Sequence, residues 1–220
     1  LEDSREKFNE SLDVLRALLS QEEVSWKGKY YNFESLTVMP RPMTKNGPPI
    51  MMAVLDPQGI YACTKRGFHI MTTPLSGDNQ LMLDQVDGFV RAKSELKDKG
   101  KDLTLSLSRV AYVAKNDSDR KEKLEMAYEY YSRFDNVFTG PGIVNNGMIE
   151  ILPRKQSIEE LDQSILICSV DEMIDKLSPY KEGGIDRVIL NMNFGANHKD
   201  TMDSIQSFSE KVIPHFSTDA

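Results

Sequence analysis

The sequence has few cysteines, no excess of basic residues and no long apolar run. Its two cysteines, Cys63 and Cys168, have no metal-ligand spacing and form no disulfide framework, so we interpret them as reduced, buried thiols of a cytoplasmic protein. The net charge of −7 argues against binding to nucleic acid or to an anionic membrane surface. No apolar stretch is long enough to span a bilayer.

Several motifs of common enzymes are also missing. No group of histidine, cysteine and carboxylate residues has metal-ligand spacing, and neither a Ser-His-Asp arrangement nor a glycine-rich phosphate loop is visible. What is present is ordinary for a globular protein: 220 residues, 40% of them hydrophobic and 28% charged. We therefore expect a substantial core and no metal site.

Residues 48–74, PPIMMAVLDPQGIYACTKRGFHIMTTP, predict a strand, a turn, a helix and a second strand. The apolar run of residues 50–55 lies between turn residues, which is typical of a strand buried on both faces. Asp56 and Pro57 then begin a helix, because aspartate caps free backbone N–H groups and proline suits the first helical turn. Ligands of such β-α-β units bind at the carboxyl ends of the strands. The turn at residues 56–59 is therefore the first candidate site.

The rest of the chain continues the alternation of helices and strands. An amphipathic helix opens the chain and a hairpin follows it, and later helices and strands recur at regular intervals. The helices are predicted at residues 1–20, 78–99, 117–134, 170–182 and 202–212, the hairpin at 22–39, and further strands at 69–73, 103–115 and 186–193. Residues 135–168 are irregular, and a segment of this length is typically functional, such as a lid.

Four strands that alternate with helices predict an α/β fold with a mainly parallel sheet. Four strands cannot close a barrel of eight, so the sheet is either open or part of a larger barrel. We expect a single domain over residues 1–220. Because the first residue is Leu1 and not methionine, we also expect that an upstream part has been removed.

Five segments agree in order and spacing with one known family. They are FNESLDVLRALLSQEEVSWKGKYYNFESLTVMPRP, PPIMMAVLDPQGIYACTKRGF, SRVAYVAKNDSDRKEKLE, SVDEMIDKLSPYKEGGIDRVILNMNFG and FSEKVIPHF. Together they resemble the carboxyl-terminal part of the luciferase-like family of flavin-dependent monooxygenases, from Phe8 to Phe216. Members of that family fold as a (β/α)₈ TIM barrel. The resemblance implies that this chain supplies roughly the last four strands and helices of such a barrel.

The resemblance implies an enzyme that oxidises a small organic substrate with molecular oxygen and reduced FMN. A separate flavin reductase would supply the FMN, and a missing amino-terminal half or a second chain would complete the barrel, with a dimer as the expected assembly. Two alternatives remain open. The chain could be a non-catalytic flavin- or partner-binding subunit of the same fold, or an oxidoreductase that uses the deazaflavin coenzyme instead.

For the flavin ring, the resemblance implies contacts at the ends of two neighbouring strands. Ala53 would pack near the ring, and Thr73 and Pro74, at the end of the next strand, would face the isoalloxazine. These positions follow from the family and not from the apolar pattern.

For the flavin phosphate, the resemblance implies Leu55, Asp56 and Gly59. Free N–H groups at a helix N-terminus suit a phosphate dianion. Asp56 departs from the family, in which serine is common at this position, because an ionised aspartate only accepts hydrogen bonds and has the wrong charge. Its other interpretation is a simple helix cap.

Two further residues are candidates for contact with the substrate. Arg109 lies in a strand and either reaches into the barrel or extends to solvent. His198 follows the last strand, on the side where loops carry function, and is either a site residue or a surface residue. His69 lies within a strand pattern, where we predict a structural hydrogen bond. No catalytic residue is assigned from the sequence.

Overall fold

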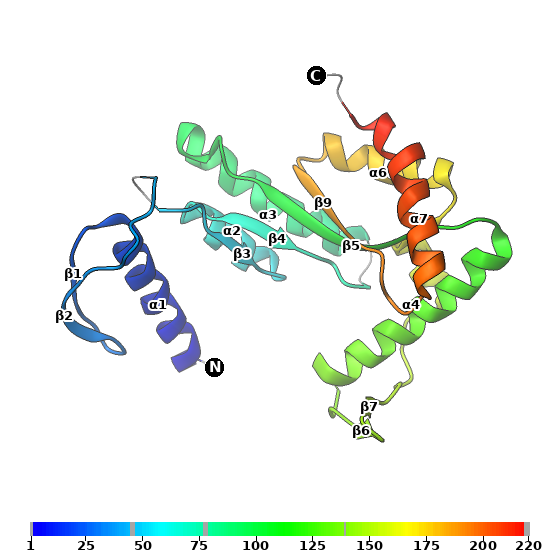
Figure 1. The fold of residues 1–220 in the computed structure, drawn as a ribbon, viewed down its shortest axis with the longest axis horizontal. Coiled ribbons are helices and arrows are strands. Elements are labelled where there is room, and N and C mark those ends of the chain that lie inside the picture. Colours follow the sequence, from blue (N-terminus) through cyan, green and yellow to red (C-terminus); the bar gives the residue numbers. More distant parts are fainter. Residues whose placement is uncertain (1, 45–46, 77–78, 139, 218–220) are drawn as a thin grey trace. The chain divides into compact units, whose positions relative to one another are not determined.

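The computed structural model describes residues 2–44, 47–76, 79–138 and 140–217 (Figure 1). The chain divides into two compact units, Leu1–Ile50 and Met51–Ala220, each of which is described by itself. The expectation of a single domain over residues 1–220 stays a prediction.

The first unit consists of one helix and one hairpin. Helix α1 spans Glu2–Ser20, and strands β1 (Val24–Lys27) and β2 (Asn32–Leu36) pair antiparallel, so the predicted hairpin of residues 22–39 forms here. The carboxylate of Glu10 accepts hydrogen bonds from the backbone N–H groups of Tyr30 and Tyr31, at 3.0 Å each, and from the indole of Trp26 at 3.2 Å. One helix carboxylate therefore holds the hairpin loop.

The second unit is built on a five-stranded sheet in which all pairings are parallel. Its strands are β3 (Met51–Ala53), β4 (His69–Thr72), β5 (Leu105–Val113), β8 (Leu166–Cys168) and β9 (Arg187–Asn191). Strand β5 is the centre of the sheet, since it pairs with β4 at its beginning, with β9 along its middle and with β8 at its end. The predicted α/β fold with a parallel sheet is confirmed, but β8 was not predicted.

Helices connect these strands in the order expected of β-α-β units. They are α2 (Pro57–Lys65), α3 (Asn79–Leu96), the 3₁₀ turn η1 (Lys97–Gly100), α4 (Asp117–Phe138), α5 (Ile158–Ser164), α6 (Val170–Glu182), α7 (His198–Lys211) and the 3₁₀ turn η2 (Ile213–His215). Ser157 and Ser169 begin α5 and α6 with complete capping boxes, in which a glutamate three residues later bonds back to the serine N–H.

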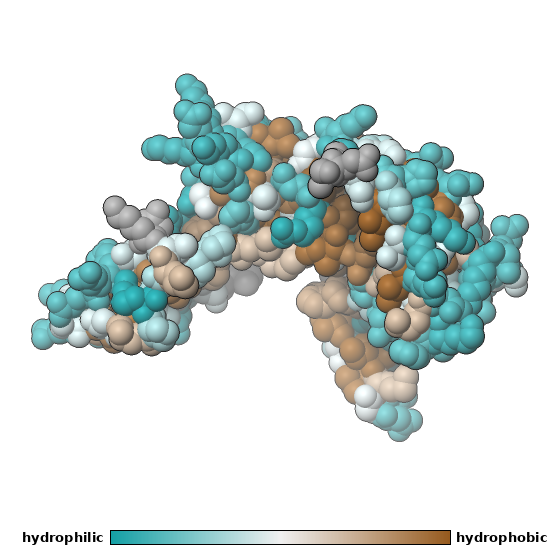
Figure 2. All heavy atoms as spheres, turned by 45° about the horizontal axis from the view of Figure 1, so that its top comes forward, coloured by the Kyte–Doolittle hydropathy of each residue, from teal (hydrophilic) through white to brown (hydrophobic). Residues whose placement is uncertain are grey.

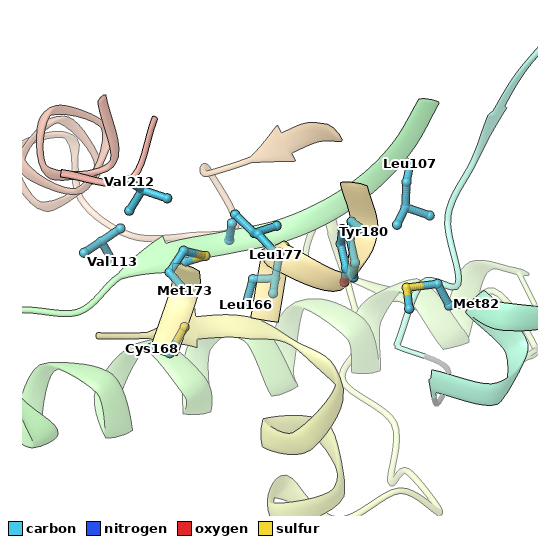
Figure 3. Close-up of a cluster of buried hydrophobic side chains, with 10 residues drawn as sticks. Met82, Leu107, Val113, Leu166, Cys168, Met173, Leu177, Tyr180 and Val212 are labelled. Carbon is cyan, nitrogen blue, oxygen red and sulfur yellow. The ribbon is translucent and has the colours of Figure 1, made fainter. Parts of the chain in front are cut away.

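One face of the sheet is covered by helices. Residues paired between parallel strands share a face, and side chains alternate between faces along each strand. Ile70 and Leu105, which are paired, are fully buried against Ile60 of α2 and Phe89 of α3. Leu107 lies on the same face and packs with residues of α6 and α7 (Figure 3). This covered face contains most of the apolar core of the second unit.

The other face is open over β3, β4 and β9, and we call it the open face. It carries Ala53, Met71, Ser106 and Arg187 in one row of paired residues. Ala53 and Arg187 are exposed and Met71 is half-buried, whereas Ser106 is buried. His69 lies on this face too, and its Nδ1 is 2.9 Å from the hydroxyl of Thr104 and accepts from the Thr104 N–H at 3.2 Å. The predicted structural hydrogen bond of His69 is confirmed.

The prediction of a strand buried on both faces is wrong for β3, and β9 is partly exposed as well. Strand β3 is shorter than the predicted 50–55, and Met51 and Leu55 are 40% and 50% exposed. In β9, Ile189 is 37% exposed. A single partner strand is not the reason, because among the described strands β8 also pairs only with β5 and is fully buried, with α6 packed on one of its faces and α4 and α5 on the other. Met51 and Ile189 instead lie on the open face, where the described part of the chain places no such layer of helices.

The segment of residues 135–168 is less irregular than predicted. Helix α4 continues to Phe138, and strands β6 (Val144–Asn145) and β7 (Met148–Ile149) form a small hairpin. Asn146 and Gly147 form its turn with positive φ angles of 48° and 78°, which is the signature of a tight hairpin turn. Helix α5 and strand β8 occupy the rest of the segment.

In the described ranges, none of the helices has the length and apolar character that crossing a lipid bilayer requires. Both cysteines are free thiols in the structure. Cys168 is buried, and burial raises the pKa of its thiol to about 11, so it stays protonated at neutral pH.

Candidate functional site

Asp56 caps helix α2. Its backbone is extended, its Oδ2 accepts a hydrogen bond from the N–H of Gly59 at 2.6 Å, and its carbonyl accepts from the N–H of Ile60 at 2.9 Å. Pro57, at the first helical position, has no N–H to offer. Most donors of the first turn are therefore already used or missing, and the carboxylate of Asp56 occupies the place that an external anion would take.

Gly59 has a packing role in this turn. A Cβ atom at this position would lie 2.9 Å from Cγ1 of Val54, which is closer than such contacts normally come. The glycine is therefore explained by the close approach of the helix to the end of β3. Nothing about its geometry requires a bound phosphate.

The ends of β3 and β4 are held together by Gln85 of α3. Its Nε2 donates to the carbonyl of Leu55 at 2.8 Å and to the carbonyl of Thr73 at 3.1 Å. Two of the predicted cofactor segments, which are far apart in the sequence, thus lie side by side. Gln85 was not predicted, because an amide in an amphipathic helix gives no signal that distinguishes it from a surface residue.

The residues expected to face the flavin ring differ in exposure. Ala53 is exposed at the end of β3, Thr73 is half-buried and Pro74 is buried. The hydroxyl of Thr73 accepts a hydrogen bond from the N–H of Leu75 at 3.0 Å, which bends the chain sharply after β4, and Leu75 has a positive φ of 56°. The strand end therefore presents its backbone and a small exposed side chain toward the open side.

Arg109 and His198 lie apart from these strand ends. Arg109 is 5% exposed and donates to the carbonyl of Ser164 at the end of α5. His198 is exposed as the first residue of α7, after the cap Asn197. Among the described residues, no hydrogen bond or ion pair joins either one to Leu55 or Thr73, so their predicted substrate contacts stay predictions.

A polar cluster beside the loop after β4 was missed. Arg154 donates to the hydroxyl of Ser76 at 2.6 Å and lies 3.2 Å from Asp135 Oδ2, with its side chain only 4% exposed. Its guanidinium stacks 5.6 Å from the ring of Tyr131, whose hydroxyl bonds to the carbonyl of Leu75. Burial raises the pKa of Tyr131 to about 12, although Arg109 and Arg154 oppose the shift. These contacts join the segment of residues 139–157 to the end of β4.

A second network fixes the start of α7. Lys123 is buried, and its Nζ lies 2.8 Å from Glu122 and 3.0 Å from Asp200. Lys115 bonds to Asp200 as well, at 2.9 Å. Hydrogen bonds from Lys115 and Lys123 hold the pKa of Asp200 well below its usual value. The helix that begins at His198 is thereby tied to α4 and to the end of β5.

Two mostly apolar cavities lie among the helices of the second unit. One of about 380 Å³ is lined by α6, β9 and the carboxyl end of α7, and one of about 370 Å³ lies among α3, α5 and α6. Neither is lined by a predicted site residue. Within the described ranges, no three histidine, cysteine or acidic side chains are placed to hold a metal ion.

Comparison with known proteins decides the family. Residues 1–187 match the family described as luciferase-like monooxygenase. This chain belongs to that family. The match includes the hairpin of the first unit and, in the second unit, strands β3, β4 and β5.

Known relatives of this luciferase-like chain are longer than the chain itself. The oxygenase component of the flavin-dependent trigonelline monooxygenase of Acinetobacter baylyi is 24% identical over 217 residues, which cover 92% of this chain and 60% of the relative. The chain therefore spans less than two thirds of that relative.

Two solved structures share the fold. An F420-dependent secondary alcohol dehydrogenase has a TM-score of 0.68 at 16% identity, over 95% of this chain and 61% of the other. The oxygenating constituent of 3,6-diketocamphane monooxygenase from Pseudomonas putida, solved in complex with FMN, has a TM-score of 0.65 at 17% identity, over 94% and 62%. At such low identities these likenesses concern the fold alone.

The two ends of an FMN molecule fit the luciferase-like chain unequally. Ala53 is small and exposed on the open face, where it pairs with Met71, two residues before the half-buried Thr73, so the end of β3 places no bulky side chain against a planar ring. The start of α2 does not fit a phosphate, because the carboxylate of Asp56 already bonds to the Gly59 N–H. The departure of Asp56 from the family pattern is thus visible in the structure as a closed helix cap.

Proposed function

We propose that this chain is part of a flavin-dependent monooxygenase that oxidises a small organic substrate with molecular oxygen and reduced FMN. The observation that carries the proposal is the family match over residues 1–187, together with parallel strands whose carboxyl ends lie side by side at Leu55 and Thr73. The flavin dependence named for the Acinetobacter relative supports the cofactor. When bound, reduced flavin supplies the electrons that activate oxygen.

The chain's own contribution is to bind and orient the ring and to exclude water. In this proposal Ala53, Thr73 and Pro74 line the ring at the strand ends, and Leu55 lies toward the phosphate end. We place the phosphate on residues outside the turn of Asp56 and Gly59, because that turn is closed. Arg109 and His198 remain candidates for contact with the substrate.

The segment of residues 135–168 is the proposed lid. It exposes large apolar side chains, among them Phe138 at 68%, Val144 at 61% and Met148 at 61%. Figure 2 shows brown, apolar atoms gathered on the part that projects downward, where Figure 1 labels β6 and β7. An apolar lid would keep water from the reacting flavin, as closing loops do in other enzymes. Arg154 would anchor the base of this lid at Ser76.

We further propose that the chain supplies the last strands of a (β/α)₈ barrel and that an amino-terminal half, or a second chain, supplies the others. The open face and the edge positions of β3 and β9 support this arrangement, since a barrel has neither. The reading frame upstream of Leu1 tests it. Continuous coding sequence for further β-α units is expected, and a start codon directly before Leu1 would contradict it.

Titration with flavins tests the cofactor. The purified chain is titrated with FMN, with riboflavin and with a deazaflavin, and bound flavin is followed by absorbance and fluorescence. We expect binding of FMN, and oxygen-dependent oxidation of an added organic substrate once a separate flavin reductase and NADH are present. A chain that binds no flavin, alone or with its amino-terminal half, contradicts the proposal.

The second candidate function is an oxidoreductase that uses the deazaflavin coenzyme. The similarity in fold to the F420-dependent dehydrogenase supports this alternative. Preferential binding of the deazaflavin, without oxygen consumption, would support it. Flavin binding without any substrate oxidation would instead support a non-catalytic binding subunit. The proposed dimer is tested by the mass of the particle in solution.

A further inference from the structure

Gln85 is a buried amide between two strand ends. It is 1% exposed, and its Nε2 donates to Leu55 O at 2.8 Å and to Thr73 O at 3.1 Å. Because both partners are carbonyl oxygens, only the NH₂ end of the amide can face them, so the orientation of the side chain is fixed by chemistry. One side chain thus binds the backbone just after β3 and just after β4.

The other end of the same amide has no partner in the described part of the chain. Gln85 Oε1 is buried without a hydrogen bond. An unpaired buried oxygen is unfavourable, and an apolar side chain of similar length would avoid it. The two hydrogen bonds to the strand ends are therefore the property that distinguishes this glutamine from an ordinary core residue.

One turn later, α3 supports the same region by close contact. Gly88 is buried, and a Cβ atom there would lie only 2.6 Å from the carbonyl oxygen of Pro57. Any larger residue would push α3 away from the start of α2. Gln85 and Gly88 together hold the backbone of residues 55–57 against the helix, one by hydrogen bonding and one by the absence of a side chain.

We propose that Gln85 is a positioning residue that sets the spacing between the strand ends carrying Leu55 and Thr73, and so shapes the flavin-ring site. This inference rests on the proposed function for its flavin part. Gln85 would act through the two backbone carbonyls and need not touch the flavin. Losing its donors would let the two ends move independently, so the ring would meet a less ordered surface.

The test uses Gln85→Met, which keeps the length of the side chain and removes both donors. The matched control is Gln80→Met on the same helix, where the exposed amide donates only to Asp84 at 2.8 Å. Hydrogen exchange of the backbone is measured first, without flavin. We expect exchange in residues 54–59 and 73–76 to become about tenfold faster in Gln85→Met, the factor expected from one ordinary net hydrogen bond, and unchanged in Gln80→Met.

Flavin binding is the second measurement, at a temperature where circular dichroism shows each variant folded. We expect Gln85→Met to bind FMN about tenfold more weakly, which is the factor that corresponds to the net free energy of one ordinary hydrogen bond. We also expect the absorption band of the bound flavin to change. Unchanged exchange at both strand ends refutes the positioning role whether or not flavin binds. Failure of the unmodified chain to bind flavin, alone and with its amino-terminal half, with the exchange result as expected, refutes the proposed function and leaves the positioning of the strand ends standing.

Discussion

Replacing Lys123 with methionine should destabilise this chain more than any other single loss of a surface-helix cation. The side chain of Lys123 is 1% exposed, and its ammonium lies within 3.0 Å of both Glu122 and Asp200. It is also 3.5 Å from Asp119 and 5.8 Å from the ring of Tyr112. Although burial opposes it, hydrogen bonds to Glu122 and Asp200 raise the pKa of Lys123, so the ammonium is charged at neutral pH.

The loss in free energy of unfolding can be worked out from the interactions that methionine keeps and those that it removes. Removing one partner of a buried ion pair typically costs 3–5 kcal/mol, about 4 in the middle of that range. The cost here should be lower, about 2–3 kcal/mol, because Asp200 and Asp119 are 20% and 13% exposed and water can solvate them. Methionine retains most of the aliphatic packing. For a chain of this size, such a loss lowers the melting temperature by about 5–10 °C.

The assay is thermal and urea unfolding followed by circular dichroism. Lys121→Met is the matched control, since Lys121 is an exposed lysine on the same helix, two residues away. We expect Lys121→Met to unfold within about 0.5 kcal/mol of the unmodified chain, as surface substitutions usually do. Equal stability of the two variants would refute the reasoning, because it would mean that the buried ammonium contributes no more than an exposed one.

Three further predictions concern the caps of helices α2 and α5 and the stability of the chain at low pH. Asp56→Ser keeps the cap of α2 and removes its charge; because we place the phosphate outside this turn, we expect the affinities for FMN and for riboflavin to stay within about twofold of the unmodified chain, and tighter binding of FMN alone in a fluorescence titration would contradict that placement. Ser157→Ala removes the capping box of α5 and should lower the free energy of unfolding in urea by about 1 kcal/mol, whereas no change would mean that the box contributes nothing. The pKa of Asp200 is depressed in the folded state, so its contribution is complete above the unfolded value of about 4 and is lost as the pH falls below it. The stability difference between the unmodified chain and Asp200→Asn should therefore be constant from about pH 5 to 8 and shrink below about pH 4, and a difference independent of pH would exclude this linkage.

The order of helices and strands could be predicted from the sequence because local signals mark it. The cap at Asp56, the helix end at Gly67 and the alternation of apolar residues depend only on neighbours in the chain. Burial of the strand at residues 50–55 could not be predicted in this way. An apolar run shows that a strand can be buried, whereas the elements that pack on its two faces decide whether it is. Among the described residues β3 and β8 each have one partner strand, yet β8 is buried between helices and β3 exposes Met51 on the open face.

The candidate site was predictable to a similar extent. The turn at Asp56 was found because turn residues and an apolar run stand next to each other. Gln85 and Arg154 were missed because each bonds to a segment distant in sequence, Gln85 to Leu55 and Arg154 to Ser76. Strand β8 was missed for a related reason: LIC is three residues long and completes the sheet only by pairing with the end of β5. Contacts of this kind have no local periodicity.

The two edge strands have a consequence for how this chain behaves in solution when nothing covers them. Strands β3 and β9 each carry a row of backbone N–H and C=O groups with a partner on one side only, and they expose Met51 and Ile189 beside that row. Such edges are templates for pairing with another molecule of the same kind. We therefore expect the chain to self-associate as its concentration rises. The same edges make it prone to aggregate during folding, before any complementary strands can reach it.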